Sequence, residues 1–163
     1  MDERQKALDM LREFDTAMLI THGPDGGLGA RPMQVAEVEA DGRVWFLTGR
    51  HTRKMEDLDR DARVTVVCQD GRQYLTLSGD GAAVTDADRA RQLWKEPYRT
   101  WFPGGADDPD LVLLSVRPRE IEYWDNAGLQ GVKYVVEAAR AYIAGERPRV
   151  DEGDQHGRAS LAP

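Results

Sequence analysis

Residues 63–84 read RVTVVCQDGRQYLTLSGDGAAV, and this stretch predicts two strands joined by a tight turn. The run from Arg63 to Cys68 is rich in β-branched residues, which favour strands. Asp70-Gly71 is a frequent two-residue hairpin turn. Gly79 and Gly81 interrupt the second strand, and glycines inside a strand indicate a β-bulge or a barrel corner.

Further strands are predicted on both sides of this hairpin. The apolar or alternating segments lie at residues 17–21, about 28–40, 44–47 and 111–116, the last extended by 121–124. The turn cluster from His22 to Gly27 and the Asp41-Gly42 pair join the first three of these strands as hairpins. With the central hairpin they make six strands, which favours an antiparallel sheet over a parallel doubly wound one.

Helical segments are expected between some of the strands and near both ends. They are a helix from Glu3 carrying Leu8, Leu11 and Phe14, a helix after the N-cap Thr52, a helix from a capping box at Thr85 and Asp88 through Trp94, a short turn at 98–102, and a helix at 132–143. The fold class is therefore mainly β with helical additions (α+β), a small six-stranded antiparallel barrel. Residues 1–145 form a single domain, and 146–163 form a polar tail unless the body of the protein holds it.

Composition excludes several functional classes. The chain has 163 residues, of which 40% are hydrophobic and 31% charged, and no stretch approaches the roughly 20 apolar residues of a membrane span. The N-terminus has no secretory signal pattern, so a cytoplasmic location is expected. The 22 basic and 29 acidic residues give a net charge of −7, which disfavours nucleic acid as a partner. The single cysteine, Cys68, reads as a core residue, and three scattered histidines predict no metal site.

The segment from Trp45 to Lys54 is the strongest candidate for binding, because it runs from a strand into the start of a helix. The N–H groups of a helix N-terminus carry partial positive charge, and Thr48, Thr52, Arg53 and Lys54 add hydroxyl and cationic donors. This composition suits an anion such as a phosphate. The alternative is a set of solvated surface charges.

Two further groups of residues are open to more than one interpretation. Arg31 lies on the strand expected to pair, through Asp41-Gly42, with the strand ending at Thr48, so it either reaches the same anion or faces solvent. Pro32 indicates an edge or a bulge. The aromatic residues of the second half of the chain are more typical of a core or a dimer interface than of ligand stacking; they are Trp94, Trp101, Phe102, Tyr123 and Trp124.

These segments together resemble the general stress protein branch of the pyridoxamine-phosphate-oxidase-like flavoproteins. The resemblance covers nearly the whole chain and rests on four strings in a fixed order, which are Ala30-Arg31-Pro32-Met33, Trp45-Phe46-Leu47-Thr48 followed by Thr52-Arg53-Lys54, Tyr123-Trp124-Asp125, and His156-Gly157-Arg158. It implies an FMN-binding split β-barrel.

The resemblance also implies site residues and an assembly. It places Arg31, Thr48, Thr52, Arg53 and Lys54 around the FMN phosphate. It places the main chain near Pro32, Met33 and Leu47 against the isoalloxazine ring or the ribityl chain. It also implies that Gln73 contributes to the flavin site, and that Trp124 reaches the flavin across the interface of a homodimer.

The same resemblance leaves the activity open. Pyridoxamine-phosphate oxidases carry an arginine and a histidine shortly after the corresponding tryptophan, whereas Trp124 is followed by Asp125-Asn126-Ala127-Gly128, so oxidation of pyridoxamine phosphate is not expected. The chain is expected to be an FMN-dependent oxidoreductase of unknown substrate, or a non-catalytic protein that binds, stores or senses flavin in a stress response. FAD or a deazaflavin are the alternative cofactors.

Overall fold

The computed structural model describes residues 2–126, 129–145 and 156–162. Within these ranges eight strands form one antiparallel sheet, and they are β1 (Thr16–His22), β2 (Leu28–Gln34), β3 (Glu37–Val38), β4 (Val44–Gly49), β5 (Arg63–Asp70), β6 (Gln73–Val84), β7 (Leu111–Asp125) and β8 (His156–Ser160). Seven of them follow the order β2-β1-β5-β6-β7-β4-β3, and β8 pairs with β7 outside this path. The predicted mainly β, antiparallel class is confirmed.

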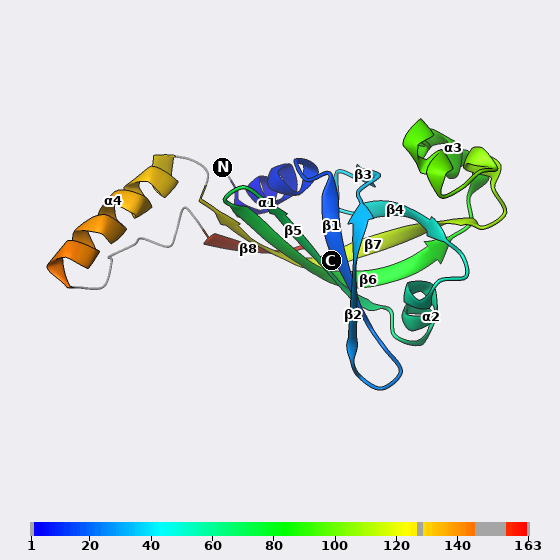
Figure 1. Cartoon of the computed structure of the whole chain (residues 1–163), viewed down its shortest axis with the longest axis horizontal. Coiled ribbons are helices and arrows are strands. Elements are labelled where there is room, and N and C mark those ends of the chain that lie inside the picture. Colours follow the sequence, from blue (N-terminus) through cyan, green and yellow to red (C-terminus); the bar gives the residue numbers. More distant parts are fainter. Residues whose placement is uncertain (1, 127–128, 146–155, 163) are drawn as a thin grey trace.

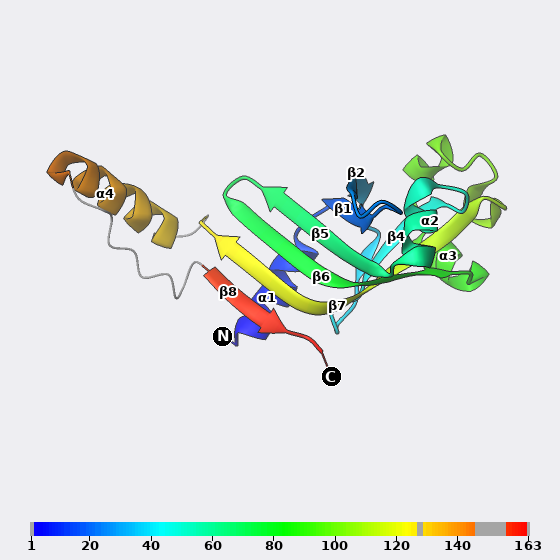
Figure 2. The same ribbon diagram turned by 90° about the horizontal axis from the view of Figure 1, so that it is seen from below.

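The sheet curls into a barrel that stays open between β2 and β4 (Figures 1 and 2). β2 pairs only with β1, so it is an edge strand, as Pro32 at its centre indicated. The long strand β7 spans the other side, where Leu111–Val116 pair with β4 and Glu120–Trp124 pair with β8. A bulge between Ser78 and Gly79 bends β6 against β7, which confirms the prediction made from Gly79.

The predicted count of six strands is too low, for two reasons. The strand expected at about residues 28–40 is split, because β2 pairs with β1 whereas the two residues of β3 pair with β4. The change of partner occurs at Val35 and Ala36, whose N–H groups donate to the carbonyls of Asp15 and Trp45, 2.9 Å away in each case. The sequence had predicted that Arg31 lies on a strand paired with β4. This prediction is wrong, because Arg31 lies on β2, which pairs only with β1.

The second additional strand, β8, lies in the segment predicted to be a polar tail. His156–Ser160 pair with Glu120–Trp124 of β7, so the body of the protein holds this part of the tail. Gly157 permits this close pairing, since a Cβ there would lie 2.4 Å from the Tyr123 hydroxyl. Residues 146–155 of the predicted tail lie outside the described residues.

Four α-helices and two 3-10 helices are found among the described residues; they are α1 (Glu3–Arg12), α2 (Arg53–Arg60), α3 (Ala87–Leu93), η1 (Glu96–Thr100), η2 (Gly105–Asp107) and α4 (Leu129–Ala144). The N-cap of α3 is Asp86, whose carboxylate accepts from Arg89 N at 3.0 Å, and not Thr85 as predicted. α4 stands away from the sheet in Figure 1. No helix among the described residues is long and apolar enough to cross a membrane.

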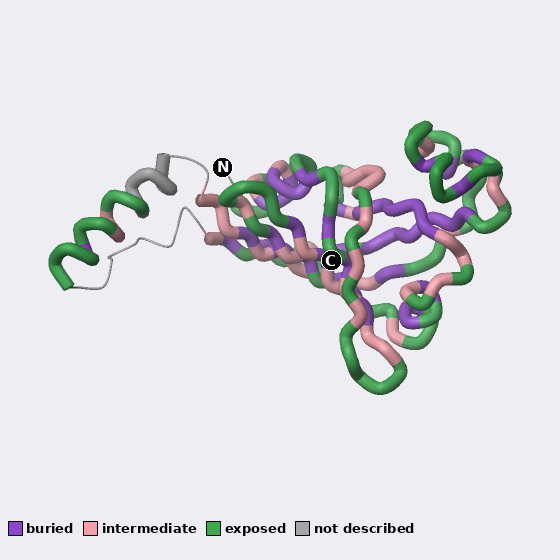
Figure 3. The backbone as a smooth tube through the Cα atoms, viewed as in Figure 1, coloured by how far each residue is buried: buried purple, intermediate pink, exposed green. Residues whose placement is uncertain are grey.

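Two hydrophobic cores occupy opposite faces of β4. The strand is therefore buried along almost its whole length (Figure 3). Val44 and Phe46 face the main core, which fills the barrel and includes α1 and the buried Cys68. Trp45 and Leu47 face a second core that also contains residues of α3 and η1. The segment from α3 to η2 therefore covers the outer face of β4, and that position brings its aromatic side chains to the open side of the barrel.

Candidate functional site

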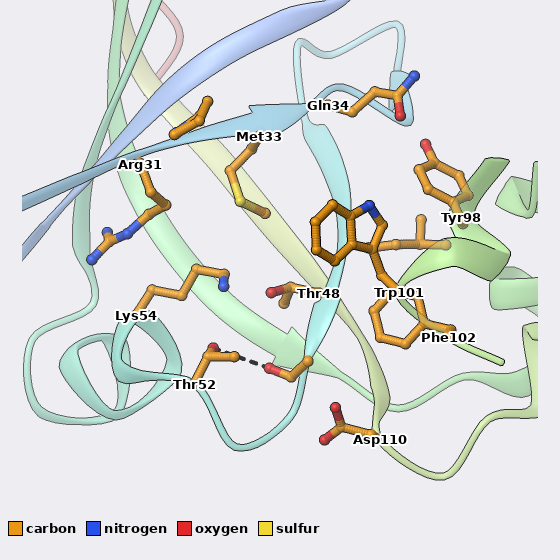
Figure 4. Close-up of a pocket in the computed structure, with 13 residues that line it drawn as sticks. Arg31, Met33, Gln34, Thr48, Thr52, Lys54, Tyr98, Trp101, Phe102 and Asp110 are labelled. Carbon is orange, nitrogen blue, oxygen red and sulfur yellow. Dashed lines mark hydrogen bonds between the residues drawn. The ribbon is translucent and has the colours of Figure 1, made fainter. Parts of the chain in front are cut away.

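A pocket of about 460 Å³ lies on the open side of the barrel, between the edge strand β2, the end of β4, the start of α2, and η1. This volume is in the range of roughly 300–1,000 Å³ that is typical of small-molecule sites. The residues that line it, ten of which are labelled in Figure 4, are Arg31, Pro32, Met33, Gln34, Leu47, Thr48, Gly49, Thr52, Lys54, Tyr98, Trp101, Phe102 and Asp110.

Arg31 and Lys54 form the cationic end of this pocket (Figure 4). The Arg31 guanidinium is fixed by contacts with the protein itself. Its Nη1 donates to Thr21 Oγ1 at 2.7 Å, and its Nη2 lies 3.8 Å from Asp57 Oδ2. Gly29 leaves room for this arrangement, because a Cβ there would lie 2.8 Å from the guanidinium. The arginine is therefore oriented before any ligand arrives.

Asp57 organises the cationic end from within the protein, and its side chain is 0% exposed. Its Oδ2 accepts from Thr21 Oγ1 at 2.8 Å, and its Oδ1 accepts from Arg60 Nη2 at 2.8 Å. Sequence reasoning did not select Asp57. The sequence of β1 did indicate a buried polar partner, because its inward-facing residues are Ala17, Leu19 and the polar Thr21. A buried hydroxyl such as that of Thr21 needs a hydrogen-bond partner inside the protein.

Lys54 has no hydrogen bond or ion pair with any described residue, although it is half-buried. Burial, and to a smaller extent the neighbouring charge of Arg31, lower the pKa of Lys54. Burial also lowers the pKa of Arg31, an effect that Asp57 opposes. Two partly desolvated cations on one wall, one of them without a counterion, are the electrostatic pattern of an anion site.

The start of α2 adds donors to the same end. Thr52 is the N-cap residue, as predicted, but its hydroxyl does not cap the helix. It donates instead to the carbonyl of Gly49 at 3.1 Å. The N–H groups of the first turn thus lack this side-chain acceptor, which suits an incoming anion. Asp110 lines the pocket beside Gly49, so its negative charge favours an anion on the Arg31 side.

The opposite end of the pocket is aromatic, and Tyr98, Trp101 and Phe102 of the η1 region form it (Figure 4). Tyr98 and Phe102 are buried, whereas the Trp101 side chain is 77% exposed. The preceding helix α3 is fixed to β3 and the residue that follows it, because Arg89 forms ion pairs with Glu37 and Glu39. Aromatic side chains at one end and cations at the other suit a flat ring that carries an anionic group.

Seven of the ten residues predicted for the site line this pocket; they are Arg31, Pro32, Met33, Leu47, Thr48, Thr52 and Lys54. Arg53 does not line the pocket, since its exposed side chain lies near the β1–β2 turn. Its charge lowers the pKa of Asp25 in that turn, although the hydrogen bond from the Gly27 N–H lowers it more. Consecutive helical residues point about 100° apart, and of this pair only Lys54 lines the pocket, although Arg53 lies close enough to Arg31 to contribute to the lowering of its pKa. Arg50 also points elsewhere and donates to the Leu111 carbonyl at 3.4 Å.

Gln73 and Trp124 lie at the far end of the sheet from the pocket. They belong to the paired ends of β6 and β7, where Gln73 Nε2 donates to Asp125 Oδ1 at 3.4 Å. The Trp124 ring stacks on His156 of β8, with centroids 5.0 Å apart. A single chain therefore does not bring these two residues together with Arg31 and Lys54, and their predicted roles depend on a second copy.

Sequence reasoning also missed several pocket residues. Tyr98, Gln34 and Asp110 carried no local motif, and Trp101 and Phe102 were interpreted chiefly as core or interface residues. Phe102 is indeed buried in the second core while it lines the pocket. No group of three histidine, cysteine, aspartate or glutamate side chains within the described ranges is arranged to hold a metal ion.

Comparison with known proteins places these features in a family. The profile described as pyridoxamine 5'-phosphate oxidase like matches residues 2–149. General stress protein 26 of Bacillus subtilis is 29% identical over 133 residues, which cover 78% of this chain and 91% of that relative.

Two solved structures extend this similarity to the fold. A protein assigned as general stress protein 26 from Jannaschia sp. CCS1 is 25% identical, with a TM-score of 0.69 and 96% of each chain covered. The general stress FMN/FAD binding protein from Xanthomonas citri is 28% identical, with a TM-score of 0.62, and the match covers 74% of this chain and 87% of that one.

Proposed function

The chain belongs to the pyridoxamine 5'-phosphate oxidase-like family, and from that premise we propose that it is a split-barrel flavoprotein that binds FMN through its phosphate. The observation that carries the proposal is the half-buried Lys54, which has no partner among the described residues and stands beside Arg31 at one end of the pocket. The FMN/FAD binding of the Xanthomonas citri relative supports the choice of a flavin.

The residues of the pocket fit the parts of FMN in order. Arg31, Lys54, the hydroxyls of Thr48 and Thr52 and the start of α2 would hold the phosphate, and the main chain near Pro32, Met33 and Leu47 would lie along the ring or the ribityl chain. The aromatic end would receive the ring, with Trp101 at its exposed side. FAD fits the same anchor through its diphosphate, and a phosphate-bearing deazaflavin is the third candidate.

We propose an oxidoreductase activity for the flavin-bound protein, on a substrate that the pocket does not identify. When bound, the flavin supplies the redox chemistry by accepting electrons from a donor. The chain binds and orients it. Pyridoxamine phosphate is not the proposed substrate, because Asp125 and Asn126 follow Trp124 where the oxidases have cations; Ala127 and Gly128 lie outside the described residues.

The binding proposal is tested by an absorbance spectrum of the purified protein, followed by titration of the flavin-free protein with FMN, FAD, a phosphorylated deazaflavin and riboflavin. We expect FMN to bind at least tenfold more tightly than riboflavin, since one charge-assisted hydrogen bond contributes about 1.5–3 kcal/mol. Equal affinities for FMN and riboflavin would contradict the phosphate anchor, and no binding of any flavin would contradict the function.

Neighbouring residues of α2 provide a matched pair of variants for the same titration. Lys54→Ala removes the cation that lines the pocket, whereas Arg53→Ala removes the one that points to the β1–β2 turn. We expect a loss of FMN affinity of about tenfold or more for Lys54→Ala and little change for Arg53→Ala. The reverse order would place the phosphate at the turn.

A second candidate function is flavin binding without turnover, for storage or sensing. Reduction of the bound flavin by NADH, NADPH and other donors, followed by reoxidation, separates the two functions. Turnover at a useful rate supports the oxidoreductase, and bound flavin that no donor reduces supports storage or sensing.

We also propose a homodimer, in which a second copy brings Gln73 and Trp124 to the flavin. Exposed apolar side chains of α4 favour association, since Tyr142 is 88% and Ile143 86% exposed. Sedimentation equilibrium of the full chain tests this, and a monomer at micromolar concentration with flavin bound would contradict it.

A further inference from the structure

The Tyr98 hydroxyl has no hydrogen-bond partner, and it is the one buried side-chain polar atom of the described residues in that state. The residue is 6% exposed, so bulk water has little access to it. Large surveys find that buried hydroxyls are nearly always hydrogen-bonded, because a desolvated polar group without a partner destabilises the protein. The missing partner is therefore expected from a molecule outside the chain.

Tyr98 lies where such a molecule would bind. It lines the pocket together with Trp101 and Phe102, at the end opposite to Arg31 and Lys54. Figure 4 shows its hydroxyl on the side of the ring toward Gln34, another lining residue, whose side chain is exposed and free to turn aside.

The Tyr98 ring is fixed, so the hydroxyl cannot search for a partner elsewhere. The ring belongs to the second core and packs at 60° against Trp94, with centroids 5.9 Å apart. Arg89 pairs with Glu37 and Glu39 and so fastens α3, the helix that precedes this segment, to β3. A partner has to come to the hydroxyl.

The protonation state of Tyr98 defines the kind of partner. Burial raises the pKa of Tyr98, so the phenol keeps its proton at neutral pH. A neutral phenol donates one hydrogen bond, and at the edge of an aromatic ring system the available acceptors are a carbonyl oxygen or an unprotonated ring nitrogen. Methyl groups cannot accept a hydrogen bond from the phenol.

We propose that the Tyr98 hydroxyl donates a hydrogen bond to a carbonyl oxygen at the edge of the ring held in the aromatic end of the pocket. Tyr98 is then a specificity-determining residue, which selects a ring that turns a carbonyl edge toward η1. This inference rests on the proposed flavin function. The flavin ring has one edge with two carbonyl groups and one edge with methyl groups, so the proposal also assigns its orientation.

Tyr98→Phe tests the proposal, because it removes only the hydroxyl. FMN and riboflavin carry the same ring, so both are expected to lose affinity by the same factor, about two- to tenfold for a neutral hydrogen bond. The infrared carbonyl band of bound FMN is expected to move to higher frequency. The melting temperature of the ligand-free variant is expected to stay equal or to rise, since the unpartnered hydroxyl is gone. Ser78→Ala, which removes an exposed hydroxyl of β6 outside the pocket lining, is the control and should change none of these.

Three results would overturn the inference. Unchanged flavin affinity in Tyr98→Phe would show that the hydroxyl does not meet the ring. A lower melting temperature of the ligand-free variant would show that the protein already satisfies the hydroxyl, for example through Gln34. An unmoved carbonyl band would exclude the proposed acceptor. These outcomes differ from failure of the flavin function, in which the wild-type protein itself binds neither FMN nor riboflavin.

Discussion

At the cationic end of the pocket the side chains belong to the barrel strands and α2, whereas at the aromatic end they belong to the segment between α3 and η2 that covers β4 from outside. Thr21, Arg31, Asp57 and Arg60 are joined by hydrogen bonds in the free protein. At the other end the Tyr98 hydroxyl has no partner and Trp101 is 77% exposed.

This difference separates two tasks of one pocket. The cationic end is built into the sheet and is ready for an anion, so its geometry should change little on binding. The aromatic end belongs to the segment between α3 and η2, outside β1, β2 and α2, and its unpartnered Tyr98 hydroxyl and exposed Trp101 are the groups available to recognise a ring.

The largest effect at the cationic end is expected from Asp57→Asn, because Asp57 is the buried carboxylate on which that end depends. The variant keeps the shape but leaves Arg31 and Arg60 without their counterion. We expect the free energy of unfolding to fall by about 2–3 kcal/mol, less than the roughly 3–5 kcal/mol of a fully buried broken pair, because Arg60 is half exposed. Urea denaturation measures this. Asp59→Asn, an exposed position on the same helix, should leave the stability unchanged; equal losses in both variants would refute the role of Asp57.

Arg31→Gln is expected to weaken FMN binding by about 1.5–3 kcal/mol, through loss of a charge-assisted hydrogen bond to the phosphate. Riboflavin has no phosphate, so its affinity should be unchanged, and calorimetric titration with both ligands makes the comparison. A parallel loss for riboflavin would mean that Arg31 contacts the ring or the ribityl chain, and the division of the pocket into two ends would then be wrong.

Much of the fold was predictable because it depends on local turn chemistry. Gly42 and Gly71 have φ values of 90° and 55°, the conformation that their Asp-Gly turns require, and the hairpins followed from those dipeptides. The change of partner at Val35 and the pairing of β8 with β7 were not predictable in this way. Both depend on contacts between segments far apart in the sequence, and nothing in either segment alone encodes them.

The candidate site also had a part that the sequence predicted and a part that it did not. Its strand-to-helix segment was recognisable from composition, but composition could not separate Lys54 from Arg53, because the direction of each side chain depends on where α2 begins. Asp57 and Tyr98 were missed because neither belongs to a motif. Each matters through tertiary packing, one as a buried counterion and the other as a buried hydroxyl without a partner.

A smaller effect is expected from pH, through Lys54. Its pKa in the free protein lies below the usual value of 10.5, and a bound phosphate would raise it again. As the pH rises through the lowered pKa, FMN binding has to recruit a proton to Lys54, so the affinity for FMN should fall by less than tenfold per pH unit.

Riboflavin binding corrects for titration of the ring itself, so the ratio of the two affinities is the quantity to measure between pH 7 and 10.5. Lys54→Arg keeps a cation that does not titrate in this range, and its ratio should stay constant. A constant ratio in the wild-type protein would mean that another group holds the phosphate.

The smallest effect is expected from Trp101→Ala, which tests the aromatic end where the side chain is already exposed to solvent. Loss of stacking should weaken FMN and riboflavin alike by about 0.5–1.5 kcal/mol, the range for aromatic pairs. The free energy of unfolding should change by less than about 0.5 kcal/mol, since an exposed side chain leaves no cavity. Phe102→Ala, at the buried neighbour, should instead lower stability by about 3–5 kcal/mol. A large stability loss in Trp101→Ala would place its indole in the second core and would contradict its assignment to the solvent-exposed side of the ring site.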